Sequence, residues 1–466
     1  MKSNIKLKAK SIKRKVLGGS PIPATSSAHA IGAGLSAASP STREPFALRA
    51  FRYYPCRSAV FIFALLVSMN VQAQVLSLDS VLAIIDKQNP MLQEYDNKVK
   101  ALNTYAEGAR SLMAPMIGAG TFMTPYANQM LMDERDKGAW MFSFEQEITN
   151  PSKLNANRKY LFSKAAVENQ NRSTQFNQLR SEAKAMYYQW LVSEEKLNIL
   201  KENERIMELM LKLARIRYPY NQGSLGNIYK AEGRLSEVQN MIQMTNGAIE
   251  ESSYRLKALM NLPVETQIMV DTATNITYEP NQLIYDTAAL STQRSDIKQI
   301  DKTIEVMRLG QQLQRYQARP DFKIRFDHMQ PIGNMPTQFT AMAMVSIPIA
   351  PWSSKMYKSE VQGMQYDIEA MKKGREAILI ETSGMLAGMA SQLTRMKQQL
   401  NNYETKIIPA LKKNYQTLML AYEENREQLP IVIDAWEALN MAQTDYIEKN
   451  QEYFNMIVSY EKELEK

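Results

Sequence analysis

The segment that decides the fold reads AYEENREQLPIVIDAWEAL and spans residues 421–439. A partial second copy lies 204 positions earlier, where Tyr218 takes the place of Tyr422 and Asn221 takes the place of Asn425. Each copy follows a long run with helical periodicity and precedes another such run. Asn often ends a helix in the left-handed backbone conformation. The sequence therefore predicts two helical hairpins, with Asn221 and Asn425 in their turns.

The rest of the chain repeats one plan at nearly the same spacing, with a first repeat at 74–263, a polar and irregular linker at 264–288 and a second repeat at 289–466. Each repeat holds a helix that a proline ends, a pair of strands and a helix on the order of 100 Å long. The strands are predicted near 116–124 and 139–149, and near 321–330 and 338–349. A period of about 200 residues indicates duplication of a whole domain.

The positive net charge of +8 is misleading, because residues 1–57 hold eleven Lys or Arg and one acid. That segment carries +10, so the remainder carries −2. We interpret 1–57 as a basic disordered extension, or as the product of a mis-assigned start. A mildly acidic remainder lacks the basic face that binding to nucleic acid requires.

Residues 58–73 form an apolar run with a small-residue exit, which predicts a secretory signal peptide that is cut before Gln74. A single membrane anchor is the alternative, although it needs about 20 apolar residues. Cys56, the only cysteine, precedes the run and so is not placed to carry a lipid. The remaining chain has no cysteine for a disulfide.

Each predicted strand alternates apolar and polar residues, as Phe322 and Lys323 do. Two strands alone are unstable in water, whereas strands with one apolar and one polar face form the wall of a membrane barrel. Four strands per chain do not close a channel, so we expect a trimer with twelve strands. Hairpins that cap a soluble helical domain are the alternative. The residues expected to face the barrel lumen are Glu145, Lys323, Arg325, Asp327, Met342 and Met344.

The order of motifs resembles the TolC-like outer-membrane efflux protein family. It is carried by Leu76-Ser77-Leu78-Asp79, Asn89-Pro90, Ile407-Ile408-Pro409-Ala410 and the duplicated plan over 76–462. The resemblance implies a mainly α protein with a membrane β-barrel: a homotrimer with a 12-stranded barrel in outer-membrane lipid and an α-helical periplasmic tunnel. It also implies two partners, a periplasmic adaptor (membrane fusion protein) and an inner-membrane pump.

The same resemblance implies site residues at the hairpin turns. Tyr422, Asp434 and Tyr218 match the periplasmic entrance, or gate. The chain departs from the family by placing Asn in the turns where Gly is usual, and Ile431 where some members have a second acid. The residues that match the adaptor-docking tips are Gly223, Ser224, Leu225, Arg426, Glu427, Gln428 and Leu429.

An enzyme is disfavoured, because His328 is the only histidine after residue 73 and no cysteine remains there. We interpret His328 as a barrel-rim or lumen side chain and expect no catalytic residue, cofactor or bound metal. The competing function is a soluble periplasmic coiled-coil adaptor or spacer. Met342 and Met344 leave one alternative substrate class open, copper or silver cations rather than drugs, because thioethers bind soft metals.

Overall fold

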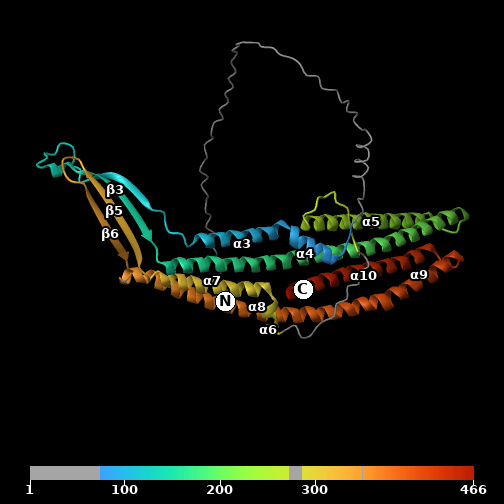
Figure 1. Ribbon diagram of the computed structural model, residues 1–466. Coiled ribbons are helices and arrows are strands. Elements are labelled where there is room, and N and C mark those ends of the chain that lie inside the picture. Colours follow the sequence, from blue (N-terminus) through green and yellow to red (C-terminus); the bar gives the residue numbers. More distant parts are fainter. Residues whose placement is uncertain (1–73, 272–285, 349) are drawn as a thin grey trace, which may run out of the picture. The chain divides into compact units, whose positions relative to one another are not determined.

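The computed structural model describes residues 74–271, 286–348 and 350–466. The extension and the signal peptide expected at 1–73 lie outside the described residues, as does most of the predicted linker. The described chain is mainly helical, and its strands form two separate sheets, the larger of which extends beyond the ends of the long helices (Figure 1). The helices are α2 (Leu78–Gln88), α3 (Pro90–Gly108), α4 (Pro151–Arg217), α5 (Leu225–Leu259), α6 (Thr287–Gln293), α7 (Ser295–Tyr316), α8 (Pro351–Asn402), α9 (Ile408–Glu423) and α10 (Leu429–Leu464).

Asparagine side chains cap two of the helices that begin with proline, α3 and α4. Asn89 accepts a hydrogen bond from the amide of Met91 at 2.9 Å, which caps α3, and donates to the carbonyl of Leu259 at 2.8 Å. Asn150 caps α4 in the same way, through the amide of Ser152 at 3.0 Å. Proline is favourable at the first helical position because its missing N–H would have no partner there.

A four-stranded antiparallel sheet joins the two repeats. Its strands are β2 (Met116–Phe122), β3 (Ala139–Ile148), β5 (Asp321–Pro331) and β6 (Gln338–Ser346), in the order β2-β3-β5-β6. The hairpin of each repeat contributes two neighbouring strands, and β3 pairs with β5 across the repeats. Residues Glu134–Lys137, in the β2–β3 connection, form one 3-10 turn.

A second, two-stranded sheet corrects the expectation of an irregular linker. Strand β4 (Ile268–Val270) lies inside the predicted linker and pairs in parallel with β1 (Gln74–Leu76). The hydroxyl of Tyr187 in α4 donates to the carbonyls of Leu76 and Asp271, at 3.3 and 3.2 Å. The start of the described chain and the end of the first repeat are thereby fixed to the long helix.

The order of the helices next to the sheet follows the order of the strands. Helix α4 packs against α3 and α7, and α7 packs against α8, which gives α3-α4-α7-α8 (Figure 1). Farther along, α4 packs against α5 and α10, and α10 packs against α9. Among the described residues no helix is both long and apolar enough to cross a membrane.

The second long helix is interrupted by a π-helical turn, Tyr403–Ile407, that separates α8 from α9. Pro409 is the second residue after this turn and has no N–H for the carbonyl one turn earlier, which explains the local widening. The interruption thus lies just before Pro409.

A buried polar network fixes how α4 and α10 meet. Asn203 accepts a hydrogen bond from the indole N–H of Trp436 at 2.8 Å and donates to Asn440 at 3.1 Å. Asn203 and Trp436 are both about 2% exposed, within an apolar core that extends to the hairpin turns. Because each polar atom has a partner in one register only, sliding of α4 along α10 would break the network.

Candidate functional site

The register of the sheet places polar and apolar side chains on opposite faces. Arg325 lies opposite Glu145 on one side and Met342 on the other, so the three share one face. Phe326 lies opposite Phe144 and Ala341, on the second face. The predicted lumen residues are thus brought together on a single face, which we call the polar face. The exposed aromatic residues of β3, β5 and β6 lie on the other, the apolar face.

Ion pairs organise the polar face. Lys323 pairs with Glu145 across β5 and β3. The Nε of Arg325 donates to both carboxylate oxygens of Asp327 at 3.0 Å, and Asp327 is buried. These pairs hold long charged side chains along the sheet.

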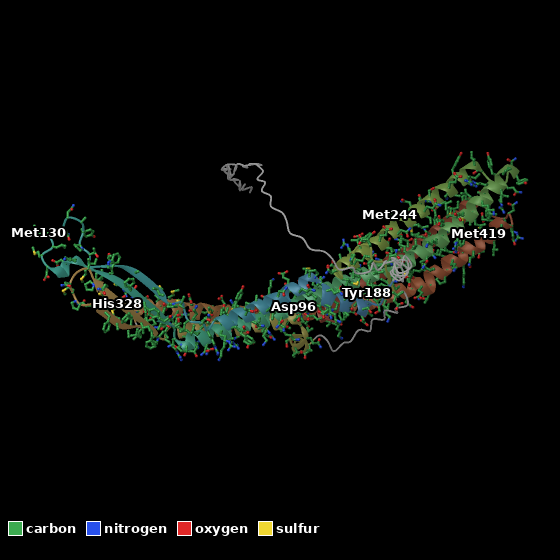
Figure 2. The ribbon with its side chains drawn as sticks, turned by 45° about the horizontal axis from the view of Figure 1, so that its top comes forward. Asp96, Met130, Tyr188, Met244, His328 and Met419 are labelled. Carbon is green, nitrogen blue, oxygen red and sulfur yellow. The ribbon has the colours of Figure 1, made fainter. Side chains whose placement is uncertain are left out.

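His328 lies on the apolar face, opposite Phe142 and Phe339. His328 therefore does not share the face of the predicted lumen residues, because a strand alternates its side chains and His328 follows Phe326 by two. Figure 2 shows His328 in the sheet, at one end of the long helices, and Met419 near their other end. Among the described residues no group of three or more His, Cys, Asp or Glu side chains could hold a metal ion.

The first hairpin turn follows α4. Its 3-10 turn (Tyr218–Tyr220) leads to Asn221, whose φ of 57° lies in the left-handed region. The amide of Asn221 donates to the carbonyl of Tyr218 at 3.1 Å, and that of Gln222 donates to Arg217 at 3.2 Å. This pair of bonds is the Schellman arrangement that ends a helix at a left-handed residue.

The second hairpin turn repeats this geometry 204 positions later. Asn425 has a φ of 68°, and its amide donates to Tyr422 at 3.0 Å. The amide of Arg426 donates to Ala421 at 2.8 Å. Both asparagines therefore have the left-handed conformation expected of them.

Arg217 connects the two turns. Its guanidinium donates to the side-chain oxygen of Asn425 at 3.1 Å and to the carbonyl of Glu423 at 3.0 Å, and lies 4.1 Å from the centre of the Tyr422 ring. We call this set of contacts the Arg217 bridge. The sequence analysis missed it. A signal was present, since the repeat places Ala421 at the matching position, so Arg217 breaks the symmetry of the tips.

The predicted gate residues have different surroundings. Tyr422 is 3% exposed, while Tyr218 is 43% exposed. Burial raises the pKa of the Tyr422 hydroxyl above its usual range, and the nearby Arg217 guanidinium opposes this shift. Asp434 is exposed but accepts a hydrogen bond from Lys230 at 2.6 Å. Lys230 is the residue 204 positions earlier, so this ion pair joins equivalent positions of the repeats.

Five of the seven predicted docking residues line a groove of about 460 Å³ at the tips. The groove is lined by parts of both turns, among them Gly223, Ser224, Glu427 and Gln428. Leu225 is exposed at the start of α5, as docking requires, and Arg426 is also accessible. Leu429 is the exception, because its side chain is 2% exposed and packs in the core instead of on the surface. The first apolar residue of α10 is needed to close that core.

Comparison with known proteins gives a result at the level of structure alone. No protein-family model and no curated protein matches the chain. The Campylobacter jejuni CmeC outer membrane channel matches with a TM-score of 0.65 and 13% identity, over 83% of this chain and 85% of that one.

The outer membrane protein VceC from Vibrio cholerae matches with a TM-score of 0.64 and 12% identity, over 83% of this chain and 95% of that one. CusC, a protein that forms a transmembrane channel, matches with a TM-score of 0.67 and 12% identity, over 85% of this chain and 95% of that one. The resemblance to TolC-like outer-membrane channels is therefore confirmed as a likeness of fold.

Proposed function

We propose that the chain is one of three identical subunits of an outer-membrane channel, a passive conduit that leads from a periplasmic adaptor and an inner-membrane pump to the exterior. One observation carries the proposal: a four-stranded sheet has an exposed apolar face, a charged face and two outer strands with one partner each among the described residues. Strands β3, β5 and β6 have 10, 11 and 9 residues, the length that crosses a bilayer.

The free edges of the sheet can join copies of the chain. Strands β2 and β6 run in opposite directions, because three antiparallel pairings separate them. The β6 edge of one subunit therefore pairs in antiparallel fashion with the β2 edge of the next. Three copies give a closed barrel of twelve strands, which leaves no edge unpaired.

The helices extend this arrangement away from the sheet. Because α3, α4, α7 and α8 follow the strand order, three copies would form a helical wall below the barrel. Helix α4 has 67 residues and is on the order of 100 Å long, which suits a tunnel through the periplasm. The hairpin turns then form the entrance, where the Arg217 bridge and the pair Lys230–Asp434 tie the two hairpins of a subunit together.

The tips also supply the surface for the adaptor. The groove beside Gly223 and Gln428 is open, and the exposed Leu225 offers an apolar contact. Tyr422 supports this surface from the core, through its ring against Arg217.

A soluble periplasmic adaptor or spacer is the competing function. It shares the helical hairpins but gives no reason for exposed Phe142, Phe144 and Phe326 on one face of a sheet. An apolar band of this kind in water would promote aggregation.

A matched pair of substitutions tests the proposal. Ala341→Arg places a charge on the apolar face, which costs about 2–4 kcal/mol at the centre of a bilayer. Thr340→Arg places the same charge one residue away, on the polar face opposite Asp327. We expect Thr340→Arg to reach the outer-membrane fraction and to conduct in planar bilayers, and Ala341→Arg to do neither. Equal recovery of both variants in the soluble periplasmic fraction would refute the channel.

A further inference from the structure

The methionines of the four-stranded sheet all lie on one face. Each of the five occupies a position that the register assigns to the polar face. They are Met116, Met141, Met329, Met342 and Met344. Packing does not explain this distribution, because methionine fills apolar cores. Here the apolar face holds mainly aromatic and aliphatic residues and no methionine.

Two of these methionines lie directly opposite each other. Met141 of β3 pairs with Met329 of β5, and side chains in such a pair have Cβ atoms about 4.5–5.5 Å apart. On the other side of Met141 lies Gly120, and a side chain added there would meet nothing within 4 Å. The two thioethers therefore have room to turn toward a common ligand.

The remaining methionines continue toward the helices. Met342 lies in the row of Arg325, and Met344 lies in the row of Lys323. Rows on one face are about 6.6–6.8 Å apart along a strand. The Met342 row is two rows from that of Met329, so it lies about 13 Å from the pair.

The charges of the polar face favour cations. Its strand positions carry four carboxylates, against the two cations Lys323 and Arg325. Lys153 of α4 pairs with one of the carboxylates, Asp321, which leaves an excess of one negative charge per chain. The carboxylates are Glu145, Glu147, Asp321 and Asp327.

We propose that the polar face binds soft monovalent cations, Ag(I) or Cu(I), with the thioethers of Met141 and Met329 as the primary ligands. Neutral thioethers bind soft cations and leave hard ones such as K⁺ in water. Met342, Met344 and Met116 are further ligands along the path. The inference rests on the proposed function, since the polar face is the wall of the conduit. It gives that conduit a substrate class.

Silver binding to the purified, detergent-solubilised protein tests the site directly. Equilibrium dialysis in chloride-free nitrate buffer at pH 5, where ordinary imidazoles are protonated, limits competition from histidine. The test variant is Met141→Leu/Met329→Leu. The control is Met130→Leu/Met132→Leu, in the β2–β3 loop, where both side chains are about 90% exposed (Figure 2 labels Met130). Leucine keeps the volume and removes the sulfur.

We expect the test variant to lose silver affinity by about tenfold or more, equivalent to about 1.4 kcal/mol, and the control to bind as the wild type does. The single variants Met141→Leu and Met329→Leu serve the same comparison if the double variant does not assemble. Unchanged silver binding in the test variants would overturn the site.

Conductance separates this inference from the proposed function. If the wild-type protein forms no channels in K⁺ solution, the proposed conduit is refuted, regardless of the measured silver affinity. Normal K⁺ channels together with unchanged silver binding in Met141→Leu/Met329→Leu refute the thioether site alone.

Discussion

Replacing Arg217 with Ala removes a side chain that joins the first hairpin to the turn of the second. The lost contacts are a cation–π contact worth about 0.5–1 kcal/mol and two solvent-accessible hydrogen bonds to neutral oxygens, each worth about 0.5–1.5 kcal/mol. Arg217 is partly exposed, so we take a sum of about 2 kcal/mol. That is about a 30-fold change in the opening equilibrium of the second turn.

Hydrogen exchange of the backbone amides measures this opening. The amides of Asn425 and Arg426 close the second turn, and those of Asn221 and Gln222 close the first. In Arg217→Ala we expect exchange at the second turn to rise by about 30-fold, while the first turn, whose bonds are within its own hairpin, changes little. If the bridge helps to hold the entrance shut, the same variant conducts more in planar bilayers.

Arg215→Ala is the matched control, because Arg215 lies on the same helix but pairs with Glu232 of its own hairpin at 2.6 Å. This exposed pair does not reach the second turn. The reasoning fails if Arg217→Ala leaves exchange at Asn425 within about threefold of wild type, or if Arg215→Ala raises it as much.

Three further predictions concern stability. Trp436→Phe leaves the buried oxygen of Asn203 without its hydrogen-bond donor and should lower the free energy of unfolding by about 1–3 kcal/mol. Denaturant titration measures this change, and an unchanged midpoint of the titration would mean that the network is not coupled to folding. Asn221→Ala should lower the free energy of unfolding by about 1 kcal/mol and Asn221→Gly should leave it nearly unchanged, because glycine adopts the left-handed conformation freely and alanine does not. Equal melting temperatures for the two variants would contradict the turn geometry. Burial raises the pKa of Tyr415 and Tyr453 above 10.0, so ionisation of these tyrosines favours the unfolded chain. The stability of the protein, followed by its helicity, should therefore be constant below about pH 10 and fall above it. Tyr415→Phe/Tyr453→Phe should make that fall shallower, and an alkaline curve identical to that of the wild type would contradict this reasoning.

Much of the fold could be predicted because its signals are local. The two asparagine turns show as an offset of 204, and the alternation around Lys323 and Met342 shows the strands and their faces. The prolines at 151 and 351 mark where the long helices begin. Apart from the offset, which compares two short segments, each of these features depends on residues close together in the chain.

The features that were missed depend on residues far apart in the chain. Strand β4 has three residues, too few for a periodicity, and its partner β1 lies about 190 positions earlier. The Arg217 bridge spans about 206 positions, so no local pattern reports it. Burial of Leu429 depends on which helices surround it, and a sequence window at the tip marks it only as apolar. The sequence placed the charged residues on one face of the sheet correctly, whereas the face of His328 required the register itself.

The number of chains in the detergent-solubilised protein tests the central claim most directly. Four strands per chain enclose no channel, so the conduit requires three copies joined through β6 and β2. Native mass spectrometry of the protein extracted from outer membranes should give a mass of three mature chains. A single chain at the concentration that conducts in bilayers would contradict the account.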